Sequence, residues 1–264
     1  MTLPDHALRA GNARATSLRA PTLLVAGGGG PLGSAVLESS LGGRRFSHVR
    51  VLAKRGFTVA MNGLEAVVVG DFDAPLATPA PIADIALIVF DRARHANGRE
   101  LAFVRPVPEA LQELAAWLHR RGVQHLIVVM PHAVSTLPDA LKEGLANLDE
   151  HAVATLGFEH LVFVRSAQAP SDARAQQWLQ RLADGVIAQM RVMVPASNQP
   201  VRAQKVAQFA IELAAALPAS EPGTRVAPPE LVWQAAQLRD PSALVAAWLA
   251  SQALPPIKAP KVRM

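Results

Sequence analysis

The 264-residue sequence contains no cysteine and no tyrosine, and none of its apolar runs approaches the length of a membrane-spanning helix. Without cysteine the chain can form no disulfide and has no thiol nucleophile or thiolate metal ligand, which is typical of a cytoplasmic protein. Without a run of about eighteen apolar residues, we expect a soluble globular protein that does not enter a membrane. Residues 1–19 also lack the apolar segment of a secretion signal, so we predict a disordered basic arm there.

The net charge of +5 comes from the two ends of the chain. Residues 1–19 hold three Arg and one Asp, which gives +2, and residues 253–264 hold two Lys and one Arg, which gives +3. The body is therefore close to neutral. No aromatic residues alternate with these cations, as they do in many nucleic-acid sites. We predict a flexible basic tail over residues 253–264 and no specific nucleic-acid partner.

A glycine-rich turn between an apolar strand and a helix is the most informative feature of the sequence. Residues 22–26 predict a buried strand, and the spacing GxxGxxG follows from Gly27 to Gly33. Glycine at these positions permits a tight turn, close approach of a phosphate and packing of the helix on the strand. The N-terminus of that helix offers free N–H groups and a partial positive charge to a pyrophosphate. The alternative is a flexible turn with no ligand.

The predicted dinucleotide contacts extend beyond this turn. Lys54 and Arg55 follow the second predicted strand, where an NAD-specific site carries an acid for the ribose hydroxyls. Cations there suit a 2′-phosphate and favour NADP(H) over NAD(H), with a solvated basic strand end as the alternative. Asp71 and Phe72 follow the third strand, near the expected adenine, although Asp71 is equally a common turn former. The predicted cofactor-binding residues are Gly27, Gly29, Gly30, Pro31, Leu32, Gly33, Lys54, Arg55, Asp71 and Phe72.

Strand and helix patterns alternate along most of the chain. Apolar runs predict strands over residues 22–26, 48–53, 65–69, 83–90, 125–130 and 160–164. Helical periodicity follows Pro31 and recurs over residues 108–122 and 139–156. Later elements are expected as helices after Ser171 and over 206–217, 231–238 and 242–249, and as strands over 190–194 and 225–227.

This order predicts an α/β fold, because alternating strands and helices build a parallel sheet with right-handed crossovers. We expect a single Rossmann-type domain over residues 20–252 with a doubly wound, mostly parallel sheet. A small C-terminal cap, drawn mainly from residues 166–252, is expected over the nicotinamide end of the cofactor.

These residues resemble a known family. The glycine turn, Lys54-Arg55 and Gly70-Asp71 are similar to atypical short-chain dehydrogenases/reductases, in particular to NmrA-like and Tat-interacting oxidoreductase-like NAD(P)-binding proteins. The resemblance spans roughly residues 20–235. It implies NADP(H) held by the glycine turn, by Lys54 or Arg55, and by Asp71.

The sequence departs from that family at its catalytic group. The family's enzymes use a Ser after the fifth strand and a Tyr-x-x-x-Lys motif on the next helix, whose Lys lowers the pKa of the Tyr for proton transfer. The corresponding places fall near Pro131, Lys142 and Ala146, and the chain has no tyrosine. Lys142 or His132 could transfer a proton instead, but a solvated lysine and a loop histidine without function are the favoured alternatives. The catalytic residues therefore stay unassigned.

Two further features concern ligands. Asp91 follows the fourth strand, where relatives have small residues, and an inward-facing carboxylate there would repel the phosphates of a dinucleotide. His125, His151 and His160 are too scattered in sequence for a metal-ligand motif, and the chain has no HExxH pair. We therefore predict no metal site.

Three functions remain open from the sequence. The first is an NADPH-dependent oxidoreductase that passes hydride to a quinone- or flavin-like acceptor without a protein acid. The second is a non-enzymatic NADP-sensing regulatory or interaction protein. The third is a structural Rossmann relic that binds no cofactor. The sequence specifies neither a small-molecule acceptor, nor a protein partner, nor an oligomeric state.

Overall fold

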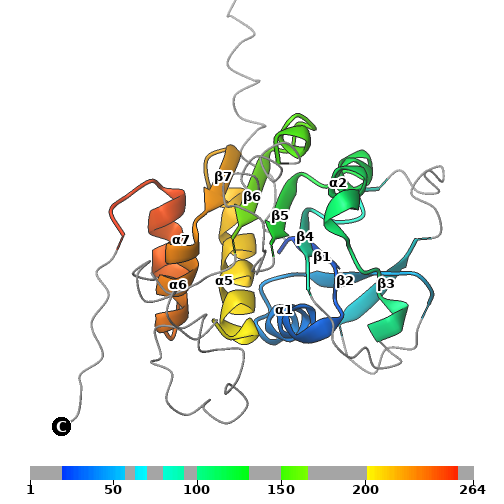
Figure 1. Ribbon diagram of the computed structural model, residues 1–264, viewed down its shortest axis with the longest axis horizontal. Coiled ribbons are helices and arrows are strands. Elements are labelled where there is room, and N and C mark those ends of the chain that lie inside the picture. Colours follow the sequence, from blue (N-terminus) through cyan, green and yellow to red (C-terminus); the bar gives the residue numbers. More distant parts are fainter. Residues whose placement is uncertain are drawn as a thin grey trace, which may run out of the picture.

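Seven parallel strands form one sheet in the order β3-β2-β1-β4-β5-β6-β7 (Figure 1). The computed structural model describes residues 20–56, 63–69, 80–91, 100–130, 150–165 and 201–254. The strands are β1 (Thr22–Ala26), β2 (His48–Ala53), β3 (Leu64–Val68), β4 (Ile85–Val89), β5 (His125–Val129), β6 (His160–Val164) and β7 (Gly223–Ala227). The strand order reverses beside β1, as in the doubly wound Rossmann fold. The predicted fold class is confirmed.

Helices cover both faces of this sheet (Figure 1). On one face α1 packs against α5, and α6 and α7 pack on α5 in turn. On the other face lies α2. The helix bounds are α1 (Gly30–Gly42), α2 (Leu111–Arg120), α5 (Ala203–Ala216), α6 (Pro229–Gln237) and α7 (Ser242–Leu249). The described residues also include the short 3-10 turns η1 (Glu100–Ala102), η2 (Pro108–Ala110) and η4 (Leu217–Ala219).

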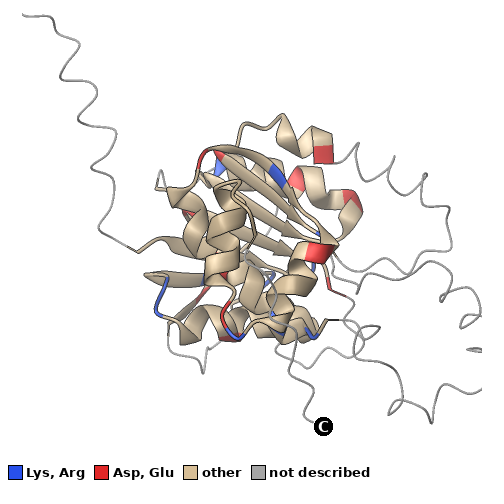
Figure 2. Ribbon diagram, turned by 90° about the vertical axis from the view of Figure 1, so that its left-hand side faces the viewer, with Lys and Arg blue, Asp and Glu red and all other residues tan. Residues whose placement is uncertain are grey.

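Burial on two faces explains why the central strands are apolar apart from the histidine that begins β5 and β6. Every residue of β4, β5 and β6 is buried. Successive side chains of a strand point to opposite faces, so Leu23 and Val25 join the core under α1 and α5, while Leu24 and Ala26 join the core under α2. Seen from the side in Figure 2, the described charged residues lie mainly at the ends of elements and on helices. The predicted strands are confirmed at β1, β2, β3, β4, β5, β6 and β7.

Residues 201–252, which the sequence assigned to the cap, complete the body of the fold. They form α5, η4, β7, α6 and α7. Buried side chains of these helices, among them Phe209, Leu231 and Val245, share one core with Val25 of β1 and Leu87 of β4. This part of the chain therefore supplies three of the helices that pack with α1 on one face, and the last strand of the sheet.

The remainder of the predicted cap, residues 166–200, lies outside the described residues. So do the predicted arm over 1–19, the residues of the tail beyond 254, the helix after Ser171 and the strand over 190–194. Within the described part of the chain, no helix is both long and apolar enough to cross a membrane.

Candidate functional site

The glycine turn is built by close packing between β1, β4 and α1. Gly27 has a φ of +97°, and a Cβ there would lie 2.2 Å from the carbonyl oxygen of Val89 at the end of β4. A Cβ at Gly33 would lie 2.1 Å from the carbonyl oxygen of Gly27. No side chain fits at either position. These two glycines are therefore required for the helix to approach the strands, whether or not a ligand binds.

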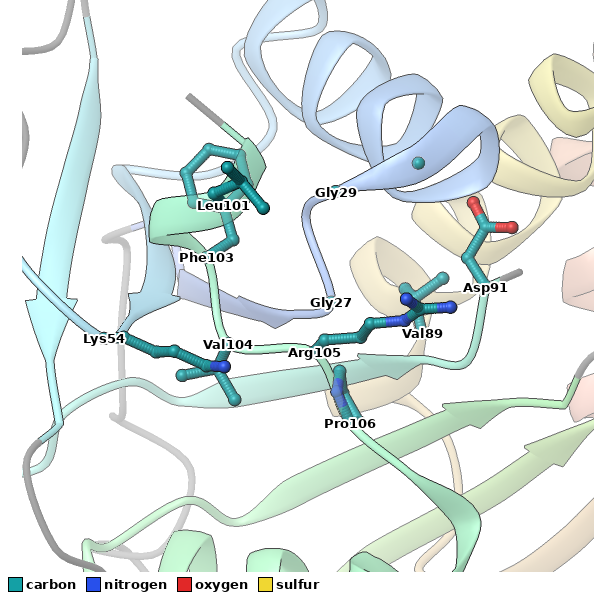
Figure 3. A pocket seen from close by; sticks show the side chains of 11 residues that line it. Gly27, Gly29, Lys54, Val89, Asp91, Leu101, Phe103, Val104, Arg105 and Pro106 are labelled. Atoms are coloured by element: carbon teal, nitrogen blue, oxygen red, sulfur yellow. The ribbon is translucent and has the colours of Figure 1, made fainter. Parts of the chain in front are cut away.

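Asp91 lies two residues beyond β4 and reaches the beginning of α1 (Figure 3). Its Oδ2 accepts a hydrogen bond of 2.6 Å from the backbone N–H of Leu32, and the N–H of Gly33 lies 3.4 Å from the same oxygen. A Cβ at Gly30 would meet this oxygen at 2.7 Å. The carboxylate thus occupies the space beside Gly30, the second glycine of the motif, which was expected to stay open for a phosphate.

This contact supplies what α1 lacks locally. The residue at the N-cap, Gly29, has no side chain to cap the helix, and the first turn holds no acidic residue. Free N–H groups and the helix dipole at such an N-terminus attract an anion. Asp91 accepts hydrogen bonds from two of these N–H groups, those of Leu32 and Gly33. It can reach them because β4, which it follows, pairs with β1 and ends beside the glycine turn. The backbone N–H groups that the sequence predicted to bind a phosphate donate to the protein's own carboxylate.

A second segment crosses the space between the glycine turn and the end of β2. The N–H of Lys54 donates to Ala102 O at 2.7 Å, and the N–H of Val104 donates to Leu52 O at 2.9 Å. Phe103 forms an isolated antiparallel bridge with Ala53 and is buried. In dinucleotide-binding folds the adenosine ribose lies between the glycine turn and the second strand. Residues 102–104 lie against that position.

The cavity that remains has a volume of about 240 Å³. Ligand sites for small molecules commonly measure roughly 300–1,000 Å³. Its lining is Gly27, Gly29, Gly30, Lys54, Val89, Asp91, Leu101, Phe103, Val104, Arg105 and Pro106. Figure 3 shows Lys54 and Arg105 approaching it from β2 and from the segment after η1, with Asp91 beside the start of α1. The charged groups in this lining are two cations and one carboxylate, which suits part of an anionic ligand.

The structure brings together part of the predicted set. Gly27, Gly29, Gly30 and Lys54 line the cavity, whereas Arg55 is not among its lining residues. Pro31, Leu32 and Gly33 form the first turn of α1. Asp71, Phe72, Lys142 and His132 lie outside the described residues.

Sequence reasoning missed the contribution of the segment 101–106. Its apolar residues precede the helix that is predicted to begin near Pro108, and they indicate no contact with β2. The backbone bonds that hold the segment on β2 leave no pattern in the sequence. A short apolar run between a polar loop and a helix start is the signal that could have drawn attention to it.

The comparisons with known proteins found similar solved structures only. No family model matches the sequence, and no curated protein is significantly similar to it. Similar solved structures include a nucleoside-diphosphate-sugar epimerase from Staphylococcus aureus, with 14% identity over 78% of this chain and 70% of that chain and a TM-score of 0.45. The enzyme WbmG from Bordetella bronchiseptica, in complex with NAD, gives 12% identity, coverages of 84% and 79%, and a TM-score of 0.43.

A short-chain dehydrogenase from Leptospira borgpetersenii with bound NAD⁺ gives 14% identity over 86% of this chain and 95% of that chain, with a TM-score of 0.42. The fold of this chain is established by its own sheet order.

Proposed function

We propose that this protein is a non-enzymatic NADP(H)-binding protein in which the carboxylate of Asp91 holds the phosphate site and must leave before a dinucleotide binds. The observation that carries the proposal is the hydrogen bond of 2.6 Å from the N–H of Leu32 to Asp91 Oδ2. A pyrophosphate oxygen needs the same donor at the helix N-terminus. The arrangement as described does not fit a dinucleotide, because two anions cannot share that donor.

The absence of tyrosine supports a function without turnover. The proton-transfer group of short-chain dehydrogenases needs a Tyr, and none occurs in the 264 residues. In the described lining of the cavity the ionisable side chains are Lys54, Asp91 and Arg105. Asp91 is engaged by α1, because its Oδ2 accepts from the N–H of Leu32.

A carboxylate of the protein that competes with the dinucleotide for the N–H of Leu32 suits a sensor better than an enzyme. When the binding-competent state is only partly populated, the apparent dissociation constant rises by the inverse of that population. A carboxylate cap contributes about 0.5–2 kcal/mol, so displacing it weakens dinucleotide binding by roughly two- to thirtyfold. The protein would then be occupied only when the cofactor is abundant, and occupancy would be coupled to the position of Asp91.

Calorimetric titration of the cofactor-stripped natural chain with NADPH and NADH tests this function. We expect weak binding of NADPH, weaker binding of NADH, and no oxidation of NADPH when quinone or flavin acceptors are added. Turnover with any such acceptor would show that the protein is an oxidoreductase, and the non-enzymatic proposal would fail.

A structural protein that binds no dinucleotide is the second candidate. It is favoured by the packing at Gly27 and Gly33, where a Cβ would lie 2.2 Å and 2.1 Å from a backbone carbonyl oxygen, so that both glycines are explained without any ligand. If this candidate is correct, the natural chain and every variant that vacates the anion site bind neither NADPH nor NADH.

The preference for NADP(H) is expected to depend on Lys54 and not on its neighbour. Lys54 lines the cavity, whereas Arg55 does not. In a chain that carries Asp91→Ala, the further change Lys54→Ala should weaken NADPH about tenfold more than NADH, because only NADPH has the 2′-phosphate that an ammonium binds. Arg55→Ala is the matched control and should affect both cofactors by less than about twofold. If Lys54→Ala and Arg55→Ala change the affinity for NADPH relative to NADH by the same factor, Lys54 is not the residue that contacts the 2′-phosphate.

A further inference from the structure

Three potential metal ligands meet at the edge of the sheet opposite the glycine turn. His125 is the first residue of β5 and His160 the first residue of β6, and the parallel register pairs them directly. Glu159 immediately precedes β6. The ligand atoms of the three side chains all lie within 4.8 Å of one another. Both histidines are buried, with exposed fractions of 5% and 0%, whereas Glu159 faces solvent.

The hydrogen bonds of His160 determine which of its nitrogens carries the proton. Its Nε2 lies 3.2 Å from the carbonyl oxygen of Ser220, which can only accept, so Nε2 is the donor. In the neutral ring Nδ1 then has a free lone pair. This atom lies 2.9 Å from Nδ1 of His125. Two nitrogens that face each other so closely need a proton or a cation between them.

The distance between the nitrogens is close to what a metal ion requires. Two histidine nitrogens bound to tetrahedral Zn²⁺ at about 2.0–2.1 Å stand roughly 3.3 Å apart. Metal binding needs the pair to open by a few tenths of an ångström, which a rotation of either ring provides. The bond from His160 Nε2 to Ser220 O is also the kind of contact that orients a metal-bound histidine.

Glu159 completes the set of three potential ligands from the solvent side of the histidine pair. The exposed carboxylate of Glu159 neutralises part of the charge of an incoming cation and leaves one coordination position to water.

We infer that His125, His160 and Glu159 form a binding site for a divalent transition-metal ion, for which Zn²⁺ is the best match. Nitrogen and carboxylate donors without thiolate suit this class of ion. The site ties the beginnings of β5 and β6 together and lies apart from the dinucleotide region. It stands independently of the proposed function.

Titration of the untagged, chelator-treated full chain with Zn²⁺, and with Co²⁺ as a spectroscopic substitute, tests the site. We expect one ion per chain, visible absorption bands of tetrahedral or five-coordinate Co²⁺, and a rise in Tm of about 5–10 °C at a hundredfold excess over the dissociation constant. Glu159→Gln should weaken Zn²⁺ about tenfold or more, and His160→Gln about a hundredfold or more. His151→Gln changes an exposed histidine in a helical segment outside the ligand set and should leave binding unchanged.

Glu159 is exposed, so its variant keeps the test valid even if the buried His160→Gln chain does not fold. Failure of the natural chain to bind Zn²⁺ with one-to-one stoichiometry would overturn the inference. So would an affinity that Glu159→Gln leaves unchanged, or one that His151→Gln reduces as strongly.

Discussion

The chain that carries Asp91→Ala is expected to bind NADPH roughly two- to thirtyfold more tightly than the natural chain, while its free energy of unfolding falls by about 0.5–2 kcal/mol. The loss of stability follows because the N–H of Leu32 loses its acceptor, and caps of this kind contribute roughly 0.5–2 kcal/mol. The gain in affinity follows because the pyrophosphate no longer has to displace a carboxylate from the same donor. Calorimetric titration and urea denaturation measure the two effects in the same sample.

Asp84→Ala is the matched control for this change. Asp84 precedes β4 as Asp91 follows it, and its carboxylate accepts a hydrogen bond of 2.7 Å from the N–H of Thr22. Its loss should lower stability by a comparable amount without changing the affinity for NADPH. If Asp91→Ala destabilises the chain and still binds neither NADPH nor NADH, the protein is structural and the binding proposal is wrong.

Gly27→Ala is expected to lower the free energy of unfolding by about 3 kcal/mol or more. The backbone there has a φ of +97°, which costs a non-glycine residue roughly 1–2 kcal/mol. The new Cβ would in addition lie 2.2 Å from Val89 O, so β4 and the glycine turn must move apart. Overpacking of this kind costs roughly 1–3 kcal/mol. Urea denaturation of the variant measures the sum.

Gly157→Ala separates the two contributions to that loss. Gly157 has a φ of +85°, close to that of Gly27, but a Cβ there meets no atom within 4 Å. Its replacement should therefore cost only about 1–2 kcal/mol. Equal losses at the two positions would mean that the glycine turn is not packed against β4 as described.

Much of the fold could be predicted because its signals are local. The strand over 160–164 and the helix over 242–249 were predicted with the bounds that the structure has. In both cases an apolar run or stripe lies between residues that end regular structure, among them Gly157 and Pro241. Burial of the central strands on both faces made their apolar runs continuous and easy to recognise.

The candidate site depended on contacts between distant residues, which local patterns do not contain. Asp91 could be placed at the end of a strand from the sequence, but its side chain is 59 residues from Leu32, and only the pairing of β4 with β1 brings them together. The approach of residues 102–104 to β2 consists of backbone bonds and has no sequence pattern. The positions of the two packing glycines, Gly27 and Gly33, were predictable from the sequence. For Asp91 the sequence predicted only that an inward-facing carboxylate would repel a dinucleotide, and not that it would bind the N-terminus of α1.

The histidine pair illustrates the same limit. His125 and His160 stand 35 residues apart, and that separation led to the prediction of no metal site. They are the first residues of neighbouring parallel strands, so the register of the sheet places their rings together. Spacing rules for metal ligands apply to one turn or one helix and do not cover ligands from adjacent strands.

The amide proton of Leu32 reports most directly on the central claim that Asp91 occupies the phosphate site. In a two-dimensional NMR spectrum of the natural chain we expect this proton far downfield, since it donates to a carboxylate at 2.6 Å. Asp91→Ala should move it strongly upfield, and saturating NADPH should move it back as a phosphate oxygen takes the place of the carboxylate. A Leu32 amide that Asp91→Ala does not shift would contradict the claim.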